Sequence, residues 1–321
     1  MSVWLPTAPC TPAGCASPRW PTVRRATAVL RLAAGTAAVL AGLVLAPVAA
    51  VLGPAGRGRL AALWCRTVMR AFGVRVRVSG AVPPRRLPGL PPGPGTLVVP
   101  NHVSWLDIPL VASVLPGRML AKREVRRWPV LGPLARLGGT LFVDRDRLRE
   151  LPAVVGAVAG ALRRGSRVVV FPEGSTWCGR ERGRFRPAAF QAALDAGAAV
   201  QPVHIAYRPV GAAAFVGDDA LGASLWRVAT AAGLTAEITV LPPIPAAAHP
   251  DRRALARAAR PAVGGAAAAG ATAAPHPRPR EPRPVPAQAT ADRDSANLPS
   301  ASVHHPVSLI PAAASSERTP S

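Results

Sequence analysis

The stretch Val98-Val99-Pro100-Asn101-His102-Val103-Ser104-Trp105-Leu106-Asp107 places a histidine and an aspartate directly after a short apolar run. Residues 96–99 are a predicted strand, and Ser104-x-x-Asp107 has the form of a capping box, which predicts a helix from Ser104. Residues five apart on one helix point about 140° apart, so His102 and Asp107 can touch only if His102 precedes the helix. Asp107 would then orient one imidazole nitrogen and leave the other free to accept a proton. The alternative is a turn histidine and a capping aspartate without chemistry.

The charge distribution favours a membrane surface as a partner. The 321 residues include 39 basic and 16 acidic ones, for a formal net charge of +23, and Lys122 is the single lysine. No Asp or Glu precedes Asp107, while arginines recur throughout that region. A basic, apolar N-terminal third suits anionic lipids. No helix-turn-helix, zinc-finger or RNA-binding signature is present, so nucleic acid is not a predicted partner.

Cysteine spacing predicts neither a disulfide framework nor a metal site. Cys10, Cys15, Cys65 and Cys178 form no C-x-x-C pair and no recognised ligand spacing. Cys178 lies beside the second motif discussed below, but its sequence neighbours offer it no partner. We therefore expect no bound metal, and we interpret Cys178 as an ordinary small residue.

The N-terminal part of the chain predicts membrane attachment. Residues 1–25 are rich in Pro, Ala and Thr without apolar periodicity, and we expect them to be disordered. Residues 26–73 are interpreted as a membrane-associated helical segment. Within it, residues 32–53 are uncharged and approach the roughly 20 residues that cross a bilayer, although a cleaved signal peptide is a competing interpretation. A spanning helix, a re-entrant hairpin and an interfacial anchor all stay open. Residues 59–72 show helical apolar spacing, typical of an amphipathic helix on the membrane or of a helix facing the core.

Strands and helices alternate over residues 74–260, which predicts a single α/β domain. The expected strands cover residues 74–78, 96–99, 119–121, 140–143, 167–171, 200–207 and 236–241. The expected helices cover residues 104–112, 154–164, 188–196 and 252–260, and residues 125–137 are expected to be broken by prolines. The His102 and Glu173 motifs follow strand ends, where ligands bind in open α/β sheets. Residues 261–321 carry few apolar anchors and are expected to form a disordered tail.

Four sequence blocks resemble one known family. They are Asn101-His102-x4-Asp107, then Ala121-Lys122-x-Glu124 with Gly139 to Arg145, then Phe171-Pro172-Glu173-Gly174-Ser175, and finally Val200-Gln201-Pro202-Val203. In order and spacing they resemble the glycerolipid acyltransferases, typified by 1-acylglycerol-3-phosphate acyltransferases. The resemblance covers roughly residues 75–245 and implies a mixed sheet flanked by helices.

The resemblance also implies an activity, which is acyl transfer from acyl-CoA or acyl carrier protein to a lysophospholipid hydroxyl. The product from 1-acylglycerol-3-phosphate would be phosphatidate, made at the cytoplasmic face of the cell membrane, where acyl thioesters occur. By analogy His102 is the general base and Asp107 orients it, without a cofactor or a protein nucleophile. The positions used around the acceptor correspond to Arg145, Glu173, Gly174 and Ser175.

One departure leaves the acceptor open. The family's third motif commonly continues with an arginine, where this chain has Thr176. A lyso-ornithine lipid or another lysolipid is therefore an alternative acceptor, and Arg180, Arg182, Arg184 and Arg186 could replace the missing charge. Two further alternatives are a metal-dependent hydrolase using His102, Asp107 and His204, and a catalytically idle membrane-binding homologue.

Overall fold

The computed structural model describes residues 8–16, 20–82, 93–144 and 146–271. In these residues a seven-stranded mixed sheet has the order β1-β7-β6-β2-β5-β3-β4. The strands are β1 (Arg75–Gly80), β2 (Thr96–Pro100), β3 (Arg118–Lys122), β4 (Leu141–Val143), β5 (Val168–Val169), β6 (Ala199–Arg208) and β7 (Thr235–Val240). The predicted α/β class and mixed sheet are thus confirmed.

Strand direction places several loops at one edge of the sheet. Strands β2, β3, β4, β5 and β6 are mutually parallel. Strand β7 is antiparallel to β6, and β1 is parallel to β7. The segments that follow β2, β3, β4 and β5 therefore leave the sheet on the same side. The motifs predicted to form the site occupy these segments.

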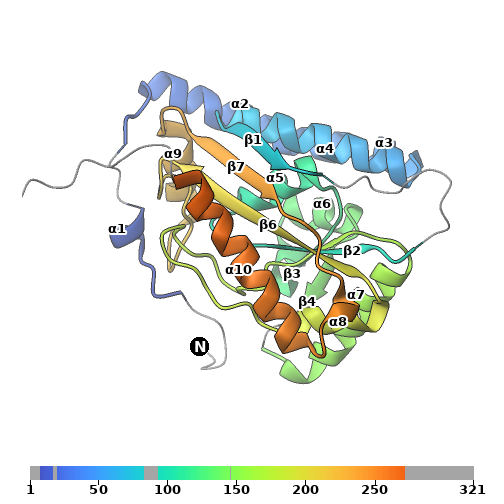
Figure 1. Cartoon of the computed structure of the whole chain (residues 1–321). Helices are drawn as coiled ribbons and strands as arrows, with labels where there is room; N and C mark the ends of the chain where they lie inside the picture. The colour runs from blue at the N-terminus through green and yellow to red at the C-terminus, as the bar shows by residue number, and fades with distance from the viewer. Residues whose placement is uncertain (1–7, 17–19, 83–92, 145, 272–321) are drawn as a thin grey trace, which may run out of the picture. The chain divides into compact units, whose positions relative to one another are not determined.

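Helices cover both faces of the sheet (Figure 1). One face carries α4 (Pro54–Ala71), α5 (Asp107–Val114) and α9 (Leu221–Thr230), with α2 (Arg25–Val44) packed on α4 and α9. The other carries α7 (Leu151–Arg163), α8 (Ala188–Ala196) and α10 (Arg252–Ala271). Strand alternation divides the core accordingly: Val98 packs with the first set of helices, and Leu97 and Val99 pack with the second. The remaining helical segments are α1 (Pro12–Cys15), α3 (Ala46–Val51), α6 (Leu131–Leu137), η1 (Arg123–Arg127), η2 (Leu148–Glu150) and η3 (Ala246–Ala248).

The apolar N-terminal segment forms a helical hairpin with α4. Helix α2 is the one described helix that is long and apolar enough to cross a membrane, and 17% of its most apolar window is buried. Gly35 and Gly42 let α4 approach closely, since a Cβ at either position would lie 2.5 Å from the ring of Phe72 or Trp64. The Trp64 indole also donates to the Ala38 carbonyl at 2.7 Å. One side of α2 therefore packs on the protein, while other apolar side chains such as Leu30 and Val44 are exposed.

Two predictions of disorder are wrong in part. Within residues 8–16 and 20–25, helix α1 forms behind a Thr11 cap, Trp20 is buried, and Thr22 pairs with Ala231. This segment packs through small residues in an irregular conformation, so it shows no periodicity. At the other end, α10 continues through Pro261 to Ala271, and Val263 is buried. The remaining residues of both predicted disordered segments, 1–7, 17–19 and 272–321, lie outside the described part of the chain.

Three other elements differ from expectation. Helix α5 begins at Asp107 and not at Ser104, after a turn. The predicted half-buried strand near Val76 is an edge strand whose Val78 is 48% exposed. Helix α9 was not predicted. With α5 starting at Asp107, His102 lies in the loop before the helix, as it also would with the predicted start at Ser104.

Candidate active site

Asn101 fixes the segment that leaves β2. Its side-chain nitrogen donates to the Ile205 carbonyl at 2.9 Å, and its side-chain oxygen accepts from the Ile205 backbone N–H at 2.7 Å. Both bonds are buried. The paired amide ties the residue before His102 to the neighbouring strand β6, so the start of the loop cannot shift relative to the sheet.

His102 and Asp107 form the contact expected from their spacing. The His102 Nδ1 lies 2.8 Å from Asp107 Oδ2. The imidazole is 19% exposed and Asp107 is fully buried. Asp107 in the first turn of α5 reaches back to the loop, which one continuous helix would not allow. The other ring nitrogen, Nε2, is left free to accept a proton from a bound molecule.

The Asp107 carboxylate is held by four hydrogen bonds. Oδ2 accepts from the backbone N–H of Val103 at 2.6 Å and of Ser104 at 2.9 Å, in addition to the His102 ring. Oδ1 accepts from the Tyr207 hydroxyl at 2.6 Å. Ser104 Oγ in turn accepts from the Leu106 N–H at 3.2 Å. A buried carboxylate is costly unless it is paired in this way, and the same bonds fix the orientation of the dyad.

Tyr207 is a site residue that the sequence analysis missed. It is the single tyrosine of the chain, and it lies near the end of β6 on the same face as Val203 and Ile205. Burial and the neighbouring Asp107 charge raise its pKa well above the usual value, so it remains a hydrogen-bond donor. The sequence offered one indication of this role, because a tyrosine in an apolar strand usually needs a polar partner for its buried hydroxyl. The sequence does not show which strand end faces Asp107.

Replacing Tyr207 by phenylalanine is expected to lower stability and weaken, without abolishing, activity. The change leaves Asp107 Oδ1 buried without its partner, which costs about 1–3 kcal/mol. Thermal unfolding in detergent and initial rates of acyl transfer measure the two effects. Thr239→Val, which removes an exposed hydroxyl bonded to Ser79, is the matched control. An unchanged unfolding temperature in Tyr207→Phe would show that this bond contributes nothing.

Glu173 holds the backbone of the loop that carries His102. Its Oε2 accepts from the His102 backbone N–H at 2.7 Å, and its Oε1 accepts from the Gly183 N–H at 3.0 Å. The side chain is 3% exposed. Gly174 follows at φ +74°, a conformation suited to glycine, and turns the chain immediately after it. These contacts give Glu173 a positioning role, while its contact with an acceptor stays a prediction.

The protonation of Glu173 predicts a pH-dependent stability. Burial, opposed by its two backbone hydrogen bonds, raises the Glu173 pKa from 4.5 to about 7. The folded chain therefore keeps a proton that the unfolded chain releases. The stabilisation is complete below pH 4.5 and is lost as pH rises through about 7.

The difference in unfolding free energy between wild type and Glu173→Gln should therefore fall between pH 4.5 and 7. The expected fall is on the order of 3 kcal/mol. Thermal unfolding across this range measures it, with the exposed Glu124→Gln as control. A difference that is flat or rises with pH would contradict the raised pKa.

Residues on both sides of Glu173 in the sequence also contact His102. The Phe171 ring stacks on the imidazole with centroids 4.1 Å apart. The backbone N–H of Trp177 donates to the His102 carbonyl at 2.8 Å, and the Thr176 hydroxyl donates to the Phe215 carbonyl. Thr176, at the position of the family's arginine, is thus engaged in a backbone contact. Ser175 is half-buried, and Arg145 lies outside the described residues.

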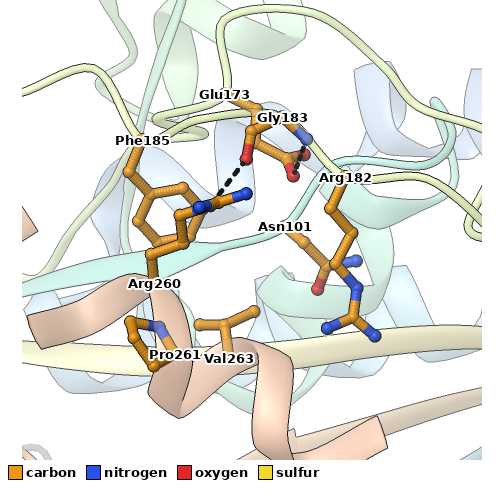
Figure 2. Close-up of a pocket in the computed structure, with 8 residues that line it drawn as sticks. All are labelled: Asn101, Glu173, Arg182, Gly183, Phe185, Arg260, Pro261 and Val263. Carbon is orange, nitrogen blue, oxygen red and sulfur yellow. Dashed lines mark hydrogen bonds between the residues drawn. The ribbon is translucent and has the colours of Figure 1, made fainter. Parts of the chain in front are cut away.

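A small cavity lies behind the loop (Figure 2). It has a volume of about 180 Å³ and is lined by Asn101, Glu173, Arg182, Gly183, Phe185, Arg260, Pro261 and Val263. The Arg260 guanidinium closes it by donating to the Gly183 carbonyl at 3.2 Å. Ligand pockets usually enclose about 300–1,000 Å³, so this cavity is too small for a lysolipid. Figure 2 shows the Glu173 carboxylate beside Gly183, while the Arg182 side chain extends past Asn101.

A second cavity is lined by arginines. Arg123, Arg126 and Arg127 of η1 and Arg136 of α6 enclose about 300 Å³. The η1 segment directly follows β3, and Arg123 contacts Asp144, just after β4, at 3.2 Å. The cavity therefore lies at the same edge of the sheet as His102. Its positive charge suits an anionic group.

The metal-hydrolase alternative lacks an assembled ligand set. His204 precedes Tyr207 by three residues on β6, so strand alternation turns it to the opposite face. Burial lowers its pKa to about 4. Among the described residues, His102, Asp107 and His204 do not form a group close enough to share a metal ion.

The fold and the site together define an acyltransferase. A family model described as Acyltransferase matches residues 75–206, which contain His102, Asp107 and Glu173. The chain is 40% identical over 211 residues to the lyso-ornithine lipid O-acyltransferase of Pseudomonas aeruginosa, covering 64% of this chain and 78% of that protein. The chain thus belongs to the Acyltransferase family, as the four sequence blocks predicted.

Two further comparisons place the chain among lipid acyltransferases. The 1-acyl-sn-glycerol-3-phosphate acyltransferase of Neisseria gonorrhoeae is 38% identical over 170 residues, which are 50% of this chain and 65% of that protein. The crystal structure of the 1-acyl-sn-glycerophosphate acyltransferase PlsC from Thermotoga maritima shares the fold with a TM-score of 0.60. That match covers 77% of this chain and 95% of the other at 18% identity. The names of the Pseudomonas and Neisseria relatives differ in the acceptor, so the acceptor has to be argued from the site.

Proposed function

We propose that the protein transfers a fatty acyl group from acyl-CoA or acyl carrier protein to the hydroxyl of a lysophospholipid. The observation that carries the proposal is the contact between His102 and the fully buried Asp107. His102 Nε2 takes the proton of the acceptor hydroxyl as its oxygen attacks the thioester carbonyl. Asp107 stabilises the imidazolium, which then returns the proton to the departing thiolate. The chemistry needs neither a cofactor nor a protein nucleophile.

The acceptor best supported is 1-acylglycerol-3-phosphate. The arginine cavity at the edge of the sheet that carries His102 supplies charge-assisted donors for a phosphate dianion. Exposed Trp128, Leu131 and Leu137 lie on or beside the same elements, and α6 packs near α2 and α3. This combination suits a headgroup bound at the surface of a membrane. We place the site at the cytoplasmic face, because acyl thioesters are cytosolic.

A lyso-ornithine lipid is the second candidate acceptor. Thr176 stands where the family's phosphate-binding motif commonly has arginine, and its hydroxyl is bonded to the Phe215 carbonyl. The Pseudomonas relative carries this activity in its name. An ornithine headgroup is zwitterionic, so it requires fewer cationic partners than a phosphate does.

Competition between the two acceptors tests the assignment. Purified full-length enzyme would receive equal concentrations of lysophosphatidate and lyso-ornithine lipid, and the products would be quantified by mass spectrometry. We expect phosphatidate to dominate. Dominant acylation of the ornithine lipid would support the acyl-transfer reaction but would assign lyso-ornithine lipid as the acceptor.

The arginine cavity makes a sharper prediction. Arg126→Gln combined with Arg127→Gln should raise KM for lysophosphatidate by about tenfold or more, which corresponds to the loss of about 1.4 kcal/mol of binding. Arg252→Gln with Arg253→Gln, exposed at the start of α10, is the charge-matched control. Equal effects of the two pairs would reduce the role of the cavity to general attraction to the membrane.

A further inference from the structure

Three of the four cysteines meet in space although they are far apart in the sequence. Cys10 and Cys15 come from the N-terminal segment, and Cys178 follows the Glu173 motif. Their sulfur atoms all lie within 4.8 Å of one another, and none of them is in a disulfide. Cysteine spacing did not foresee this group, because its ligands come from two segments that pack only in the folded chain.

The surrounding structure buries two of the three cysteines and half-buries the third. Cys10 is 5% exposed, Cys178 is 2% exposed and Cys15 is half-buried. Ala214 and Val216 pack around them. Thr11 caps the short helix that presents Cys15, and Gly179 at φ +86° turns the chain directly after Cys178. Sulfur atoms from both segments thereby point to one place.

The number of sulfur atoms distinguishes a metal site from a redox pair. A disulfide joins two sulfur atoms at about 2.05 Å and would leave the third thiol over. Three thiolates about 2.3 Å from one tetrahedral zinc ion lie roughly 3.8 Å apart, which falls within the observed spacing.

We propose that Cys10, Cys15 and Cys178 bind one thiophilic metal ion, with zinc as the favoured ion. Binding releases the three thiol protons and leaves a fourth position for water or a small ligand. The site joins the N-terminal segment, which carries Cys10 and Cys15, to the loop that carries Cys178. That loop contacts the His102 loop, because the backbone N–H of Trp177 donates to the His102 carbonyl at 2.8 Å. The ion's role is structural, because it would hold the loop that contacts His102.

Metal content of the full-length protein tests the proposal. The protein would be purified in detergent without a polyhistidine tag and analysed by mass spectrometry for metals. We expect about one zinc ion per chain, lost in Cys10→Ser and in Cys178→Ser and retained in Cys65→Ser, whose buried cysteine lies on α4. Added zinc should also raise the unfolding temperature of the wild type but not of Cys178→Ser.

A measurement on the wild type alone covers the case in which the cysteine variants fail to fold. Cobalt titration of the zinc-free protein should produce thiolate-to-metal charge-transfer absorption, and zinc should displace it. Four free thiols counted after denaturation with chelator agree with the site. Two free thiols would show a disulfide and overturn the proposal. Four free thiols without zinc or cobalt binding would also overturn the proposal. The three cysteines would then only pack against one another.

Discussion

Acyl transfer by the His102→Ala variant is expected to fall by about two to four orders of magnitude in kcat, the range that general-base catalysis contributes. The variant removes the nitrogen proposed to take the acceptor proton, while Asp107 keeps its bonds to Val103, Ser104 and Tyr207. The fold should therefore survive, and KM should change much less than kcat. Initial rates with saturating acceptor, together with thermal unfolding, separate the two effects.

His249→Ala is the matched control for that experiment. His249 lies after η3, outside the loops that hold the dyad, so its replacement should leave kcat within about twofold. A His102→Ala enzyme that keeps more than a tenth of the wild-type rate would show that another group accepts the proton.

Asp107→Asn has the second largest expected effect and acts on both activity and stability. The amide offers one acceptor oxygen in place of two and carries no charge to stabilise the imidazolium. We expect kcat to fall by about 10² to 10⁴, as loss of the orienting carboxylate does in comparable dyads and triads. The weakened bonds to buried N–H groups should lower the unfolding free energy by about 1–3 kcal/mol. The exposed Asp146→Asn is the control.

A double variant tests whether the two residues act as one unit. If Asp107 works through His102, adding Asp107→Asn to His102→Ala should reduce kcat little further, although the stability loss should still appear. Fully multiplicative losses in kcat would mean that Asp107 contributes to catalysis independently of the imidazole.

The dyad could be predicted because its geometry is local. His102 and Asp107 lie five residues apart, and a strand, a turn and the start of a helix determine whether they meet. The sequence placed the start of the helix at Ser104, whereas α5 begins at Asp107. The contact forms in either case, because the carboxylate belongs to the first turn and His102 to the loop before it.

Contacts between distant segments could not be predicted in the same way. Tyr207 reaches Asp107 across 100 residues, and Glu173 reaches the His102 N–H across 71. Both depend on the strand order β6-β2-β5, which local patterns do not specify. The motif resemblance indicated that Glu173 belongs to the site, but its two backbone bonds became visible only in the fold.

The chain ends show the limits of compositional reasoning. Residues near Cys10 lack periodicity, yet they pack because the Cys178 loop supplies a complementary surface. The last helix was expected to end at residue 260, because residues 261–321 carry few apolar anchors. Helix α10 nevertheless continues past it, and Val263 gains burial in the core behind the sheet.

The most direct test of the central claim uses membranes that contain wild type, His102→Ala or His249→Ala at equal abundance. Each receives labelled acyl thioester, as acyl-CoA and as acyl carrier protein, with lysophosphatidate and lyso-ornithine lipid offered together. The account predicts labelled phosphatidate from wild type and His249→Ala, and almost none from His102→Ala. Labelled product formed equally by all three, or by none with either donor, would contradict the claim that His102 and Asp107 catalyse lysolipid acylation.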